Sequence, residues 1–102
     1  MKPIIIHPLA QREFERQIIW LKKHGLEIDS AQMFHDEIRL ALEDLAHRSH
    51  HRPLIQAPSY FRVGPTPKFR FSVIYKIAGE AIHVVAFAAP QRRPGYWKRR
   101  QV

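Results

Sequence analysis

The chain has 102 residues, no cysteine and a formal net charge of +8 at pH 7. This is the length of one ordinary domain, so we expect a single domain over residues 1–102. The lack of cysteine excludes a disulfide framework and a thiolate metal site. The opening apolar run is too short for a signal peptide, and no stretch approaches the roughly 20 apolar residues of a membrane span. We therefore expect a soluble, cytoplasmic protein.

The start of the chain predicts a strand followed by a helix. Three consecutive isoleucines within Lys2 to His7 indicate a short strand that is buried on both sides and central or nearly central in its sheet. Pro8 suits the first turn of a helix, and Gly25 is a natural stop. The apolar face of this helix consists of Ala10, Phe14, Ile18 and Leu21. Trp20 lies beside that face and is expected in the core.

A second helix is predicted from Asp29 and Ser30 to about His47. Its apolar stripe consists of Phe34, Ile38, Ala41, Leu42 and Leu45. The connection between the helices is short, so we expect them to pack as an antiparallel hairpin. His47, His50 and His51 cluster at its end, but no zinc spacing is present. We interpret them as a solvated helix end and expect no metal site.

Three strands are predicted in the second half of the chain. Tyr60 to Val63 is a brief candidate within the otherwise loop-like segment Leu54 to Pro67. Apolar and polar residues alternate from Phe69 to Ile77, and a turn follows at Ala78 to Ala81. Ile82 to Ala88 is nearly all apolar, which indicates an interior strand. The predicted fold is α+β: an N-terminal strand, an antiparallel two-helix hairpin and a three-stranded antiparallel meander, in the order β-α-α-β-β-β.

A basic, aromatic tail follows over residues 90–102. Two prolines and a glycine prevent the preceding strand from continuing. Cations next to large aromatic rings offer charge and stacking surface together. These residues are Arg92, Arg93, Tyr96, Trp97, Lys98, Arg99 and Arg100. The alternative is that Tyr96 and Trp97 anchor the C-terminus against the helices, which would leave the arginine cluster unexplained.

The basic excess lies entirely in the second half of the chain. Residues 1–58 contain eight Lys and Arg and eight Asp and Glu, whereas residues 59–102 contain nine and one. Such asymmetry indicates a surface for nucleic acid or for an acidic protein partner. A surface that merely keeps the protein soluble is the alternative.

Four segments, in this order, carry a resemblance: IIIHPLAQREFE, FHDEIRLALEDL, KFRFSVIYKIAGEAIHVVAF and the closing RRPGYW. Together with the order of elements, they resemble the RelE/ParE superfamily of bacterial toxins from type II toxin–antitoxin pairs, and most closely the ParE-like members that end in RRPGYW. Essentially the whole chain is covered. Two departures stand out: Arg70 and Phe71 replace a Pro and a Tyr of the family hairpin, and Ala89 falls where many relatives with this ending have a His.

The resemblance implies a toxin that a cognate, acidic antitoxin neutralises within a hetero-oligomer, and the basic half of the chain suits such a partner. In the ParE-like branch the toxin binds DNA gyrase and blocks replication without catalysis. The cationic and aromatic residues of the tail would then bind the target or the antitoxin. We favour this branch because no complete catalytic set is visible in the sequence.

The RelE-like branch implies instead a metal-independent endonuclease that cuts mRNA on the ribosome. Such cleavage needs a base for the 2′-hydroxyl, cations for the phosphate and an acid for the leaving oxygen. The candidates are Arg62, Lys68, Arg70 and Arg92 as phosphate clamps, His83 or Tyr96 as proton carriers, and Tyr96 as a stacking partner for a base. A third possibility is a non-toxic basic module that only binds the antitoxin. No cofactor or metal is expected in any of these cases.

Overall fold

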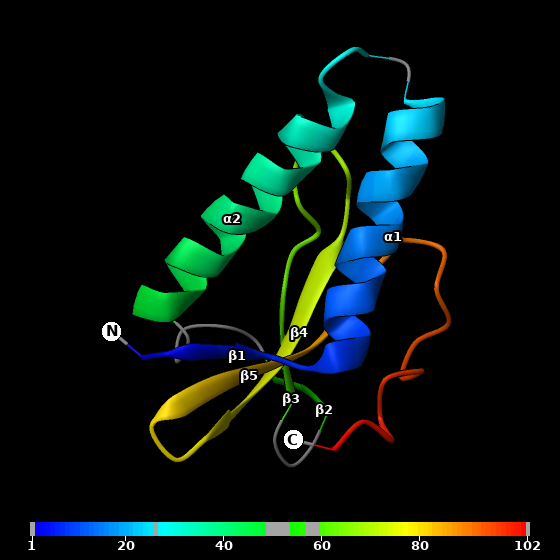
Figure 1. Cartoon of the computed structure of the whole chain (residues 1–102). Coiled ribbons are helices and arrows are strands. Elements are labelled where there is room, and N and C mark those ends of the chain that lie inside the picture. The colour runs from blue at the N-terminus through cyan, green and yellow to red at the C-terminus, as the bar shows by residue number, and fades with distance from the viewer. Residues whose placement is uncertain (1, 26, 49–53, 57–59, 102) are drawn as a thin grey trace.

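The computed structural model describes residues 2–25, 27–48, 54–56 and 60–101. Within these residues the elements are β1 (Ile4–Ile6), α1 (Pro8–His24), α2 (Ser30–Arg48), β2 (Leu54–Gln56), β3 (Tyr60–Val63), β4 (Ser72–Ala78) and β5 (Ala81–Ala88). The strands form one sheet in the order β1-β5-β4-β3-β2, and the two helices pack against one face of it (Figure 1). The predicted α+β layout is confirmed, with β2 as an additional strand where a loop was expected.

Strand β1 lies at the edge of the sheet, so the prediction of a central strand buried on both sides is wrong. It pairs in parallel with β5, with Ile4 opposite Ile82 and Ile6 opposite Val84. The sheet is therefore mixed and not purely antiparallel. Ile5 points away from the helices and is 49% exposed. A run of isoleucines identifies a strand, but it does not determine how many neighbours that strand has. The interior position belongs to β5, as predicted.

Helix α1 has the predicted start and end. At its start the His7 ring nitrogen Nδ1 accepts a hydrogen bond from the Leu9 N–H at 3.0 Å, and Pro8 occupies the first turn. Basic side chains in the last turn stabilise the negative end of the helix dipole; they are Lys22, Lys23 and His24. Gly25 follows with φ −63°, so it is not needed for a positive φ. Glycine is required at this position because the Cβ of any other residue would overlap the Ser30 hydroxyl.

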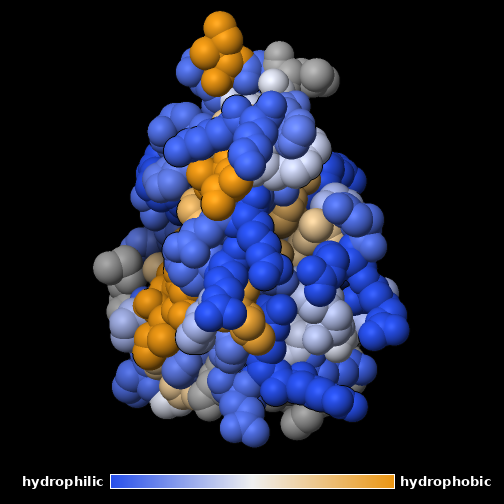
Figure 2. Space-filling view, turned by 45° about the vertical axis from the view of Figure 1, so that its right-hand side comes forward, coloured by the Kyte–Doolittle hydropathy of each residue, from blue (hydrophilic) through white to orange (hydrophobic). Residues whose placement is uncertain are grey.

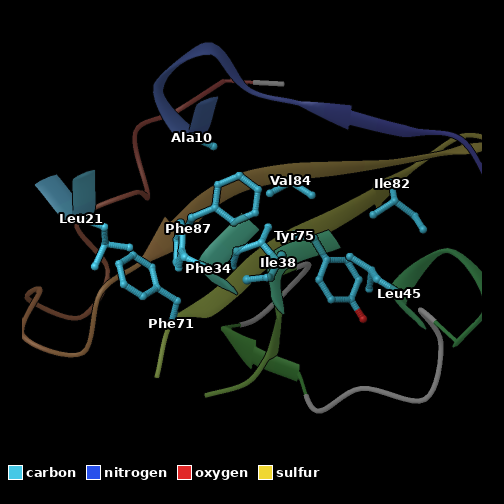
Figure 3. Close-up of a cluster of buried hydrophobic side chains, with 11 residues drawn as sticks. Ala10, Leu21, Phe34, Ile38, Leu45, Phe71, Tyr75, Ile82, Val84 and Phe87 are labelled. Atoms are coloured by element: carbon cyan, nitrogen blue, oxygen red, sulfur yellow. The ribbon is translucent and has the colours of Figure 1, made fainter. Parts of the chain in front are cut away.

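The main core lies between the helices and the sheet (Figure 3). Its fully buried or nearly buried members come from both helices and from the sheet: Ala10, Leu21, Phe34, Ile38, Leu45, Phe71, Val73, Tyr75, Ile82, Val84 and Phe87. Phe34 is central to an aromatic group, with its ring centroid 5.5 Å from that of Phe14 and 4.9 Å from that of Phe71. The apolar stripes predicted for the two helices are confirmed as their packed faces.

Trp20 lies outside this core, contrary to the prediction. Its side chain is 54% exposed on the outer side of α1, where it contacts the ring of His24. Successive helical residues are rotated by about 100°, and that rotation moves Trp20 from the apolar stripe to the flank of the helix.

The chain between β3 and β4 is a loop that hydrogen bonds between Thr66 and Phe71 hold together. The N–H of Thr66 donates to the Phe71 carbonyl at 2.9 Å, and the Thr66 hydroxyl accepts from the Phe71 N–H at 3.0 Å. Arg70 adopts a positive φ of 64° within this loop. The regular strand therefore starts at Ser72 and not at Phe69, although Phe69 and Phe71 still pack into the core. Alternation of apolar residues predicted their burial correctly, but not their backbone conformation.

Candidate functional site

The tail packs against the outer face of the sheet, by which we mean the face opposite the helices. Trp97 is only 4% exposed and packs against Ile74, Val85 and Ala86. Tyr60 of β3 contacts it as well, with 4.7 Å between the ring centroids. Trp97 therefore anchors the tail on the sheet and not on the helices, and it presents little surface to a partner.

The tail folds into consecutive turns along the sheet (Figure 1). The Arg92 N–H donates to the Ala89 carbonyl at 3.1 Å, and the Lys98 N–H donates to the Gly95 carbonyl at 3.1 Å. This path directs the tryptophan inward and leaves most of the cationic side chains exposed; these are Arg92, Arg93, Lys98 and Arg99.

Glu13 of α1 joins the tail to the sheet. Its carboxylate accepts hydrogen bonds from the Phe87 N–H at 3.1 Å and from the Tyr96 hydroxyl at 2.5 Å. The Arg100 guanidinium donates to both carboxylate oxygens, at 2.9 and 3.2 Å. Arg100 also donates to the Val85 carbonyl at 2.9 Å. The side chains of Glu13 and Arg100 are only 10% and 12% exposed, so this is a nearly buried ion pair with further hydrogen bonds to both partners.

Glu13 and Arg100 cover the part of the β5 edge that does not pair with β1. The register between β1 and β5 ends at Val84. Beyond it, the Val85 carbonyl binds Arg100 and the Phe87 N–H binds Glu13. Backbone groups at an open strand edge are costly when buried without partners. The two side chains therefore complete the hydrogen bonding of β5 where the neighbouring strand ends.

Tyr96 is held in its protonated form. Burial, followed by the hydrogen bond to Glu13 and the charge of that carboxylate, raises the pKa of Tyr96. Arg92 covers the ring, with its guanidinium carbon 3.8 Å from the ring centroid. The hydroxyl and one ring face are thus both occupied by neighbours within the protein.

A first hollow, the Arg62 hollow, lies on one side of the tail and encloses about 440 Å³. Arg62 alternates along β3 with residues that face the helices, which places its side chain on the outer face. Arg92 and Arg93 of the tail also line this hollow. Among the described residues that line it, none is acidic.

A second hollow, the Lys76 hollow, lies near the end of the tail and encloses about 480 Å³. It is lined by Lys76 of β4 and by Lys98, Arg99 and Arg100 of the tail. The Lys76 ammonium lies 5.4 Å from the centroid of the Tyr60 ring. Within the described part of the chain, no Asp or Glu lines this hollow either.

The residues predicted for RNA cleavage do not all meet. Arg62, Arg92 and Tyr96 line the Arg62 hollow. Lys68 and Arg70 lie in the loop before β4 and not on a strand beside Arg62. The Lys68 ammonium instead contacts the Glu27 carboxylate at 2.6 Å.

His83 lies near the start of β5. It is in register with Lys76 on the outer face, and it lines neither hollow. Of the three histidines that cluster in sequence near the end of the second helix, His47 is an exposed residue of α2, whereas His50 and His51 lie outside the described residues. The described residues contain no group of three or more His, Asp or Glu side chains that could hold a metal ion.

The role of Glu13 was not predicted from the sequence. This residue lies on α1 directly before Phe14, and its side-chain partners Tyr96 and Arg100 are 83 and 87 residues away along the chain. No local spacing connects such distant residues. The one available signal was a carboxylate beside the apolar stripe of a helix, and such residues are usually solvated.

No protein-family model matches the chain, and no curated protein sequence is significantly similar to it. Neither described helix is long and apolar enough to cross a membrane.

Proposed function

We propose that this chain is the toxin of a type II toxin–antitoxin pair, and that it acts by binding DNA gyrase rather than by cleaving RNA. Two features support the family: the order of elements along the chain, and a tail that leaves the cationic side chains of Arg92, Arg93, Lys98 and Arg99 exposed. The observation that carries the choice of a binding mechanism is the dispersal of the candidate cleavage residues over three places in the fold.

Cleavage without a metal requires a base, an acid and cations within hydrogen-bonding distance of one phosphate. Lys68 is paired with Glu27, and the Tyr96 hydroxyl donates to Glu13. His83 lines neither of the cationic hollows. The Arg62 hollow thus provides cations, but the described residues provide no free proton carrier beside them. Such a surface is suited to binding.

The helix side of the molecule supports the proposed antitoxin. An apolar groove of about 510 Å³ runs between the two helices and β1, and its apolar lining includes Ile4, Ile6, Phe14, Ile38 and Leu42. In Figure 1 the two helices diverge toward the start of α1 and the end of α2, where β1 lies. A wrapping segment could bury apolar side chains in this groove, while its acidic residues are attracted by the basic half of the chain.

Gyrase supercoiling assays with the purified chain test the proposal. We expect supercoiling to be lost and cleaved DNA to accumulate. The Arg93→Gln/Arg99→Gln double variant should be weaker, whereas Arg12→Gln/Lys23→Gln, which removes the same charge from the exposed side of α1, should inhibit like the wild type.

Unaffected gyrase would contradict the proposal. In that case, primer extension on mRNA in a cell-free translation reaction distinguishes the alternatives. Cuts that require ribosomes would identify the chain as the endonuclease. Intact mRNA would leave the non-toxic antitoxin-binding module as the remaining alternative.

A further inference from the structure

The outer face carries six cations that come from two different parts of the chain. Register and alternation place two of them on the sheet, and the turns of the tail add four beside them. The six are Arg62, Lys76, Arg92, Arg93, Lys98 and Arg99. Together they line the two hollows described above.

These six charges are not neutralised by neighbours. Arg100 is paired with Glu13, but none of the six forms an ion pair within the described residues. The second half of the chain contains a single acidic residue, Glu80, in the turn between β4 and β5. The outer face therefore presents unbalanced positive charge, which attracts a polyanion.

The aromatic rings on this face are buried or covered by neighbouring side chains, so they are not free to stack on a ligand. Trp97 is buried, and Arg92 covers the ring of Tyr96. The ring of Tyr60 contacts both Trp97 and Lys76. Single-stranded nucleic acid is bound largely by stacking on open aromatic rings. Cations without exposed rings do not match this mode of binding.

We propose that the outer face binds the phosphate backbone of duplex DNA, without regard to sequence. Backbone contacts of this kind need only cations in suitable positions, because phosphates carry no sequence information. In Figure 2, which turns the side of the tail toward the viewer, hydrophilic residues separate the hydrophobic patches from one another. The choice of DNA over other duplexes rests on the proposed function, since the proposed target holds DNA.

Fluorescence anisotropy with a labelled DNA duplex of about 30 base pairs tests this in the absence of gyrase. Binding should weaken steeply with salt, with a slope of log K against log salt of about −5 if all six cations contact phosphates. The Arg93→Gln/Arg99→Gln variant should reduce the magnitude of the slope by about 2. The control variant Arg12→Gln/Lys23→Gln should leave the slope unchanged, although its net charge equals that of Arg93→Gln/Arg99→Gln. Thermal unfolding should show that both variants are folded.

Three results would overturn the inference: equal salt slopes for the two double variants, tighter binding of a single strand than of the duplex, or equally good competition by poly-glutamate. Tighter binding of duplex RNA than of duplex DNA would overturn the choice of DNA. The gyrase assay is separate, because duplex binding without gyrase inhibition would contradict the proposed function alone. Gyrase inhibition without duplex binding would contradict only the inference.

Discussion

The carboxylate of Glu13 and the guanidinium of Arg100 lie 2.9 Å apart, although one belongs to the first helix and the other to the end of the tail. Both side chains are nearly buried, and both bind backbone groups of β5 beyond the end of β1. This pair therefore does two things: it fixes the tail to the body of the protein, and it closes an open edge of the sheet.

Replacement of Glu13 by alanine should destabilise the protein by about 3–5 kcal/mol, because it leaves the nearly buried Arg100 without a counter-charge. Urea unfolding measures this loss. Glu15→Ala is the matched control on the exposed side of the same helix, and it should change stability by less than about 0.5 kcal/mol. Equal effects of the two substitutions would show that the ion pair is not what holds the tail.

Ionisation of Tyr96 should make stability dependent on alkaline pH. An unperturbed tyrosine has a pKa of about 10, and the pKa of Tyr96 is raised in the folded protein. The unfolded chain therefore loses this proton first, so the contribution is complete below about pH 10 and is lost as pH rises above it. Between about pH 9 and about pH 11, the wild type should lose more unfolding free energy than Tyr96→Phe. Identical losses would contradict the raised pKa.

The two tryptophans should differ in their contribution to stability. Trp97→Ala removes a buried anchor from the outer face and should cost about 3–5 kcal/mol. Trp20→Ala changes a half-exposed side chain and should cost less than about 1 kcal/mol. Fluorescence provides a second measurement, since iodide should quench the Trp20→Phe variant, which retains Trp97, less than the Trp97→Phe variant. The reverse order of quenching would place the buried ring at Trp20.

Glu37 of α2 should stabilise the loop that precedes β4. Its carboxylate accepts hydrogen bonds from the backbone N–H groups of Lys68 and Phe69, at 2.8 and 2.9 Å. Glu37→Ala should cost about 1–3 kcal/mol, since these donors lose their acceptor. Glu43→Ala breaks only an exposed pair with Arg39 and should cost about 0.3–0.5 kcal/mol. Thermal unfolding of both variants would separate these cases, and equal shifts would contradict a specific role for Glu37.

The sequence by itself determined which segments form helices and most of the strands. Helical spacing from Ala10 to Leu21 and from Phe34 to Leu45 identified the buried stripes correctly, because this periodicity follows from local helix geometry. The apolar run from Ile82 to Ala88 indicated an interior strand for the same local reason. The sequence also located the basic excess in the second half of the chain.

Only the tertiary structure decided how these segments meet. The edge position of β1, the parallel pairing with β5 and the exposure of Trp20 depend on neighbours that are distant in sequence. The same holds for the candidate site: Glu13 meets the tail, Lys68 is drawn toward Glu27, and Arg62 joins Arg92 in one hollow. Periodicity records which side of an element is apolar. Hydrogen bonds and ion pairs across more than 30 residues are set by packing, which leaves no local pattern to read.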